Sequence, residues 1–154
     1  MRIPILTILL INSVVASGQV ATNTCERNLT NLYNQAFMRY INELQEPTKL
    51  TFDTLFVDKE NLPTDSLMTS FNNTKLLILN DNQVLERSKQ GFVLIKIFPV
   101  EHIKSNFIVS FVSFVVSYDE KTKEVVYENP GSTWIVFNFR KGKYLFKSIQ
   151  NNGI

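Results

Sequence analysis

The 154-residue chain contains a single cysteine, Cys25, and a single histidine, His102. One cysteine excludes an internal disulfide, which many small exported domains use for stability. One histidine excludes a zinc site built from a cluster of histidines. Stability must therefore come from buried side chains, and we expect no metal or other cofactor.

Glycine and proline are also scarce, with five residues of each. The glycines fall at expected turns and near the start of the chain, so they form no phosphate-binding loop or dinucleotide fingerprint. The Gly-x-Ser-x-Gly elbow of serine hydrolases and the Cys-x-x-Cys pair are missing as well. These absences favour a binding protein over an enzyme.

Neither sign of charge is in large excess, because the chain has 16 Lys+Arg residues and 14 Asp+Glu residues. Domains that bind nucleic acid usually carry a clear basic surplus, so nucleic acid is not an expected partner. Arg140, Lys141, Lys143 and Lys147 form a local basic cluster. This cluster is interpreted as a solvated hairpin tip, with contact to an anionic surface as the alternative.

The chain begins with an apolar segment. Arg2 precedes the apolar run Ile3 to Val15, and the small residues Ala16 and Gly18 follow it. This order is typical of a secretory signal peptide. This run of 13 residues is shorter than the roughly 20 that span a bilayer as a helix. We therefore expect a cleaved signal peptide over residues 1–18 and a secreted or periplasmic protein.

The rest of the chain, residues 19–154, has the length and apolar content of a single domain without a membrane span. Cys25 is interpreted as a free thiol, because a polar spacer separates it from the apolar run and argues against lipidation. Pairing with a second chain is the alternative. Glycosylation sequons begin at Asn28 and Asn72 and carry meaning only in a eukaryotic secretory pathway, so their role stays open.

Hydrophobic spacing predicts one long helix over residues 24–46, which Pro47 ends. A strand is predicted over 49–57 and a compact apolar segment over 75–79, whereas residues 84–89 fit either a helix or a strand. The apolar positions of the helix are Leu29, Leu32, Tyr33, Ala36, Phe37, Tyr40, Ile41 and Leu44.

The chain becomes rich in predicted strands from Phe92 onward, and turns are expected at 119–123, 129–131 and 141–142. Both faces of the strand over 106–118 are apolar, so it should be covered on both sides. The helix is one expected cover, and the segment 49–73 or a partner subunit is the other. The predicted strands are 92–99, 106–118, 124–128, 132–140 and 143–150.

These elements predict an α+β fold in which one long N-terminal helix packs on a curved antiparallel β-sheet, a meander. The element order resembles the cystatin-like and nuclear-transport-factor-2-like group, in which a curved sheet wraps a helix and can enclose a pocket. The run from Gly131 to Lys147 resembles the C-terminal hairpin of uncharacterised secreted α+β proteins of Gram-negative gut-type bacteria. The resemblance implies export and a fold, but no site residues.

Four residues are candidates for a pocket or a surface site: Asp53, His102, Tyr118 and Trp134. Asp53 lies within a strand pattern and His102 lies between two strands, and either side chain can serve as a base. A solvent-facing strand residue and an exposed loop residue are the respective alternatives. Tyr118 and Trp134 can line a ligand pocket or fill a core.

The sequence therefore predicts a secreted or periplasmic non-enzymatic binding protein, a class that includes inhibitors and immunity proteins. Its partner is expected to be another protein or a small apolar ligand. One alternative is a small pocket enzyme of the isomerase or hydrolase kind that uses Asp53 or His102. Another is a homodimeric envelope component whose central strand is buried by its twin.

Overall fold

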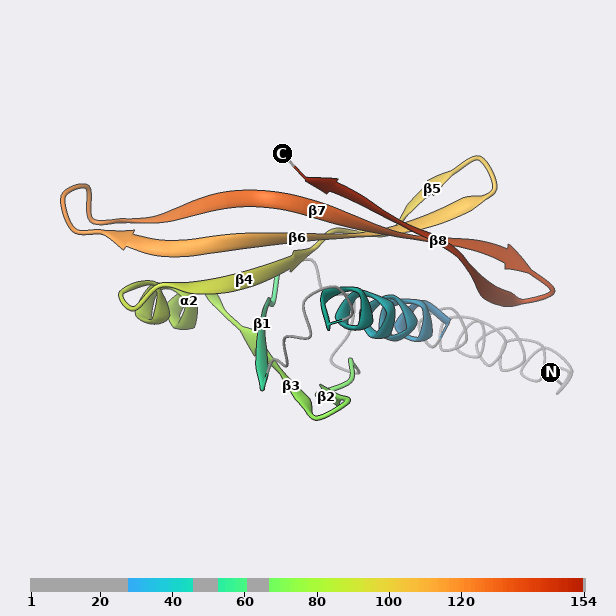
Figure 1. Ribbon diagram of the computed structural model, residues 1–154, viewed down its shortest axis with the longest axis horizontal. Helices are drawn as coiled ribbons and strands as arrows, with labels where there is room; N and C mark the ends of the chain where they lie inside the picture. Colours follow the sequence, from blue (N-terminus) through green and yellow to red (C-terminus); the bar gives the residue numbers. More distant parts are fainter. Residues whose placement is uncertain (1–27, 46–52, 61–66, 154) are drawn as a thin grey trace, which may run out of the picture.

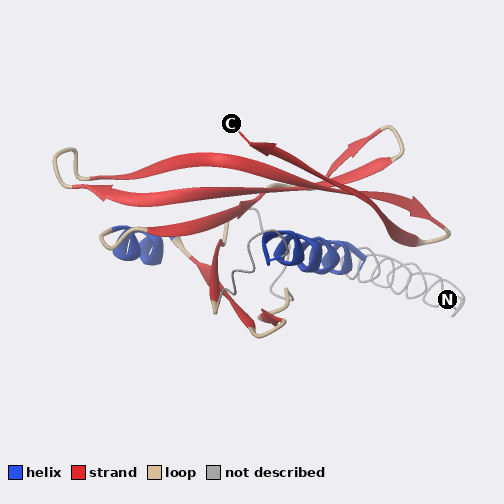
Figure 2. Cartoon of the chain, viewed as in Figure 1, coloured by secondary structure: helices blue, strands red, loops and turns tan. Residues whose placement is uncertain are grey.

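The computed structural model describes residues 28–45, 53–60 and 67–153. These residues form an α+β fold with an open, mostly antiparallel sheet, which confirms the predicted fold class at that level (Figure 2). The predicted signal peptide and Cys25 lie outside the described residues. The helices are residues 28–45 and α2 (Asp81–Ser88), and the strands are β1 (Thr54–Asp58), β2 (Ser70–Phe71), β3 (Thr74–Leu79), β4 (Phe92–Ile97), β5 (Glu101–Ile103), β6 (Asn106–Asp119), β7 (Glu124–Arg140) and β8 (Lys143–Gly153).

The 28–45 helix buries the apolar stripe that its sequence predicts. Leu32, Ala36 and Ile41 are fully buried in the main core, which they share with residues of β1, β3, β4, β6 and β7. The Tyr33 hydroxyl accepts a hydrogen bond of 3.0 Å from the Val100 backbone N–H, which ties the helix to the chain after β4. No helix within the described ranges is both long and apolar enough to cross a bilayer.

The strands follow the order β2-β3-β1-β4-β6-β7-β8, and β5 pairs with β6. The prediction of an antiparallel meander is correct for β6, β7 and β8, whose successive pairs are antiparallel. The sheet as a whole is not purely antiparallel as expected, because β1 joins it and lies parallel to both β3 and β4. α2 forms the crossover from β3 to β4, so these two strands run in the same direction on either side of β1, and residues 59–73 form the connection from β1 to β3.

α2 occupies the segment that hydrophobic spacing left undecided. A capping box starts it: the Asn80 side chain accepts a hydrogen bond from the Gln83 backbone N–H at 3.1 Å, and the Gln83 side chain accepts one from the Asn80 N–H at 2.9 Å. This reciprocal pair satisfies two N–H groups at the helix start. Val84 then turns inward and is buried.

The two expected glycine turns of the meander have different outcomes. Lys141 and Gly142 have φ values of 49° and 75° and join β7 to β8 in a two-residue hairpin, as predicted. The expected turn at 129–131 is wrong, because β7 runs through it. Val115 pairs with Glu128 and Ser113 pairs with Gly131, so Asn129 and Pro130 form a bulge opposite Phe114.

The sheet is curved, and its concave face holds the 28–45 helix (Figure 1). α2 packs against the other face, where Val84 joins Leu79, Leu94 and Val116 in a smaller core. The central strand β6 is therefore covered by helices on both faces over part of its length. The second cover is α2 and not residues 49–73, whose described core residues Leu55, Val57 and Leu67 lie in the main core with the 28–45 helix. Cover by a partner subunit stays a prediction.

Candidate functional site

The four residues singled out from the sequence lie apart from one another. Asp53 is exposed before β1, and His102 is exposed on β5, a short strand where a loop was expected. Tyr118 pairs with Val125 near the β6–β7 turn. Trp134 lies partly exposed in the middle of β7. Because Asp53 and His102 both face solvent, neither is placed as a base inside a cavity.

An apolar pocket of about 480 Å³ lies between the 28–45 helix and the concave face of the sheet. None of the four predicted residues lines it. Among its described lining residues, no side chain carries a charge. These residues are Tyr40, Leu44, Thr54, Leu55, Phe56, Phe92, Val93, Ile95, Ser113 and Val115.

The pocket exists because β4 and β6 extend past the part of the sheet that the described helix covers. Val93 on β4 pairs with Val115 on β6, and both side chains are exposed at the pocket although they belong to the apolar face. Two residue pairs further along, Ile95 is fully packed and Ser113 faces it across the strands. The pocket thus runs from the closed core to an open apolar surface.

The polar side chains of the pocket lining are the hydroxyls of Tyr40, Thr54 and Ser113. The Tyr40 and Ser113 side chains share a hydrogen bond, and the Tyr40 ring stacks on Phe111 with centroids 4.5 Å apart and planes 8° apart. Burial raises the pKa of Tyr40 to about 12, and the hydrogen bond from Ser113 only partly opposes this effect. The phenol is therefore neutral at ordinary pH and can both donate and accept a hydrogen bond.

This chemistry suits binding rather than acid–base catalysis. An aliphatic body can lie against Leu55, Val93 and Ile95, while one hydroxyl or carbonyl group of a ligand reaches the Tyr40–Ser113 pair. A general base working near neutral pH needs a pKa in that range, and a phenol with a pKa of about 12 does not provide one. Pockets of this size and composition are typical of small-molecule sites.

Sequence reasoning did not single out Tyr40 or Ser113, although one signal was available. Ser113 interrupts the core-facing row of β6, which otherwise reads Phe107, Val109, Phe111 and Val115. A hydroxyl in such a row needs a partner when it is buried. Tyr40, on the apolar stripe of the helix, supplies this partner.

A buried ion pair lies on the other face of the sheet. The Lys96 Nζ lies 3.0 Å from the Asp58 carboxylate, which is almost fully buried, and 3.3 Å from the exposed Glu60 carboxylate. Burial lowers the pKa of Lys96, but the hydrogen bonds and charges of Asp58 and Glu60 outweigh it and raise the pKa overall. Lys96 also lies 5.2 Å above the Tyr127 ring. Since these groups satisfy one another, we assign the cluster a structural role.

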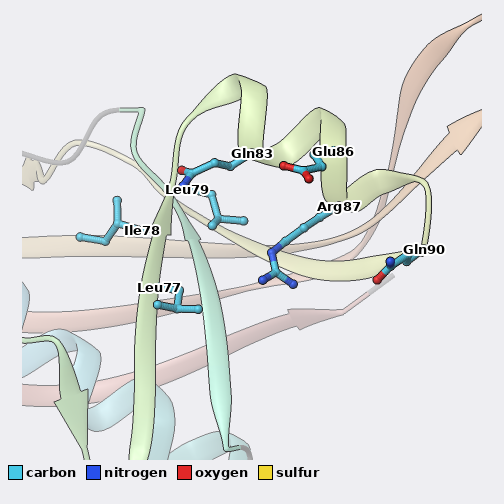
Figure 3. A pocket seen from close by; sticks show the side chains of 7 residues that line it. All are labelled: Leu77, Ile78, Leu79, Gln83, Glu86, Arg87 and Gln90. Carbon is cyan, nitrogen blue, oxygen red and sulfur yellow. The ribbon is translucent and has the colours of Figure 1, made fainter.

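A second hollow, of about 360 Å³, lies beside α2, where Gln83, Glu86 and Arg87 of the helix meet Leu77 and neighbouring residues of β3 (Figure 3). Two of its polar side chains serve the fold: Gln83 completes the capping box. The Arg87 guanidinium stacks 4.3 Å above the Phe56 ring. Fewer polar side chains of this hollow are therefore available to bind a ligand than its lining residues suggest.

Within the described residues, no group of three or more His, Cys, Asp or Glu side chains is placed to hold a metal ion. No protein-family model, curated protein or solved structure matches the chain. The strongest indication of function is therefore the chemistry of the apolar pocket.

Proposed function

We propose that the protein is an exported, non-enzymatic binding protein that takes up a small, uncharged, mostly apolar ligand. The observation that carries the proposal is the uncharged pocket of about 480 Å³ between Tyr40 and strands β4 and β6. Its volume lies within the roughly 300–1,000 Å³ of small-molecule sites. The predicted signal peptide over residues 1–18 would deliver this pocket to the periplasm or the exterior.

The predicted long N-terminal helix would form the fixed wall of the pocket. Tyr33, Phe37 and Ile41 hold the described part of this helix in the main core, so that Tyr40 and Leu44 keep their places. The opposite wall is the sheet, which is rigid because its strands are paired on both sides. A wall on each side favours a site formed before the ligand arrives, which lowers the entropic cost of binding.

The lining also selects the chemical class of the ligand. A carboxylate or ammonium group that entered the pocket would lose hydration without gaining an opposite charge from the described lining residues, which is costly. A hydroxyl or carbonyl group would exchange water for Tyr40 and Ser113. The proposed ligand is therefore an aliphatic or alicyclic molecule with one neutral polar group.

Calorimetric titration with octanol, decanol and dodecanol tests the proposal. Each added methylene should tighten binding about fourfold until the pocket is full, because burial of a methylene contributes about 0.8 kcal/mol. Decanoate, titrated at a pH where it is ionised, should bind at least about tenfold more weakly than decanol. The absence of a saturable site for all three alcohols would contradict the proposed function, and equal binding of decanoate would contradict the ligand class.

A further inference from the structure

The end of the sheet opposite the β6–β7 turn exposes large apolar side chains. This end comprises residues 101–107, around the turn between β5 and β6, and residues 138–147, around the turn between β7 and β8; we call it the tip. Both turns lie at the right of the view in Figure 1. Its exposed apolar residues are Ile103 (47% exposed), Phe139 (45%), Leu145 (49%) and Phe146 (39%).

Aromatic contacts hold the two parts of the tip together. The Phe107 ring lies 4.5 Å from His102 of β5, 5.3 Å from Tyr144 and 6.1 Å from Phe139, measured between centroids. Phe139 and Tyr144 are a cross-strand pair with centroids 4.9 Å apart. The tip is therefore a packed unit rather than two separate loops.

The apolar side chains of the tip project from both faces of the sheet. Phe139 pairs with Tyr144 on the concave face, whereas Leu145, next along β8, points to the other face because side chains alternate along a strand. A flat protein surface can cover only one face of such a projection. A lipid interface can surround both.

Basic side chains surround this apolar surface. Residues 101–107 and 138–147 contain one acidic residue, Glu101. None of their basic side chains has an ion-pair partner within the described part of the chain. Arg39 of the 28–45 helix adds a guanidinium 4.4 Å above the Phe146 ring. The basic residues of the tip are Lys104, Arg140, Lys141, Lys143 and Lys147.

The opposite end of the sheet has the reverse charge. Around the β6–β7 turn, the acidic residues outnumber Lys121 and Lys123. The basic tip and the acidic β6–β7 end thus lie at opposite ends of the long axis of the molecule (Figure 1). The small net charge of the chain does not reveal this separation. The acidic residues of this end are Asp119, Glu120, Glu124 and Glu128.

We propose that the tip docks on the surface of an anionic lipid membrane. Its aromatic and aliphatic side chains would enter the headgroup region, where amphipathic rings are favoured, and its Lys and Arg side chains would contact lipid phosphates. A soluble polyanion such as nucleic acid satisfies the basic residues but leaves Ile103 and Leu145 without a partner. The proposal does not depend on the pocket.

Co-sedimentation with vesicles of phosphatidylglycerol and phosphatidylcholine, against phosphatidylcholine alone, tests this proposal on the protein produced from the full sequence. The double variant Lys141→Gln/Lys143→Gln should bind anionic vesicles about 25-fold more weakly, since each lysine near such a surface contributes about fivefold. Lys121→Gln/Lys123→Gln is the matched control at the opposite end and should change binding by less than about twofold. Every variant carries the same N-terminal residues, so any contribution of these residues to vesicle binding is equal in all variants and cancels when their affinities are compared.

A second pair of variants tests the apolar part of the tip. Leu145→Asn should weaken binding about tenfold, and Val126→Asn, an exposed apolar position outside the tip, should leave it unchanged. Equal binding to neutral and anionic vesicles would overturn the proposal, as would equal losses in the two lysine double variants. Tight binding to heparin or DNA without binding to anionic vesicles would also overturn it.

Discussion

Replacing Phe111 by alanine is expected to lower the free energy of unfolding by about 4 kcal/mol. Phe111 is fully buried at the centre of the main core. Its ring stacks on Tyr40 at 4.5 Å and meets the edge of Phe37 at 5.1 Å, so it joins the 28–45 helix to β6. Removing the ring leaves a cavity between helix and sheet that these neighbours can fill only in part. Urea denaturation followed by circular dichroism measures the loss.

Phe98→Ala provides the matched control for this prediction. Phe98 lies just after β4 and is 39% exposed, and its backbone N–H bond to the Ser110 carbonyl does not depend on the side chain. Its truncation should cost less than about 1 kcal/mol. If both variants lost the same stability, Phe111 would not be the residue that holds the helix on the sheet, and the pocket wall that depends on this contact would lose its support.

Replacing Ser113 by leucine is expected to weaken decanol binding about 100-fold. The larger side chain projects from β6 into the pocket, occupies volume that the ligand needs and removes the hydrogen bond to Tyr40. Loss of this bond should raise the pKa of the Tyr40 phenol further, because Ser113 is the group that lowers it. Calorimetric titration gives the affinity, and the ultraviolet absorbance of tyrosinate follows the phenol.

The control for the Ser113 substitution is Ser117→Leu, on the same face of the same strand. Ser117 is exposed and does not line the pocket. This variant should bind decanol as tightly as the unmodified protein. A loss of equal size in both variants would indicate a general effect of leucine on β6, and unchanged binding in Ser113→Leu would place the ligand elsewhere.

Local patterns in the sequence predicted those elements whose stability is also local. The helical stripe from Leu32 to Ile41 and the Lys141-Gly142 hairpin form as expected, because spacing and turn chemistry depend on near neighbours. The turn predicted at Pro130-Gly131 is wrong because strand pairing with residues far away in the sequence determines the structure there. Pairing with both β6 and β8 outweighs the turn preference of these two residues, and the extra residue is absorbed as a bulge.

Local sequence patterns could not predict the candidate site. The pocket forms where Tyr40 of the helix meets Ser113 of β6, and only the folded chain brings these residues together. The common direction of β3 and β4 on either side of β1 depends on α2, which is short and whose apolar face is narrow. The charge separation between the two ends of the sheet is likewise invisible in the overall composition.

We expect an uncharged ligand to bind between the 28–45 helix and the concave face of the sheet. Methyl-resolved NMR during titration with decanol locates the ligand on the protein. Saturable shifts are expected for methyl groups of Leu44, Leu55, Val93, Ile95 and Val115, with those of Val84 and Val136 on the other face unchanged. Shifts centred on Val84, or no saturable shifts at all, would contradict this expectation.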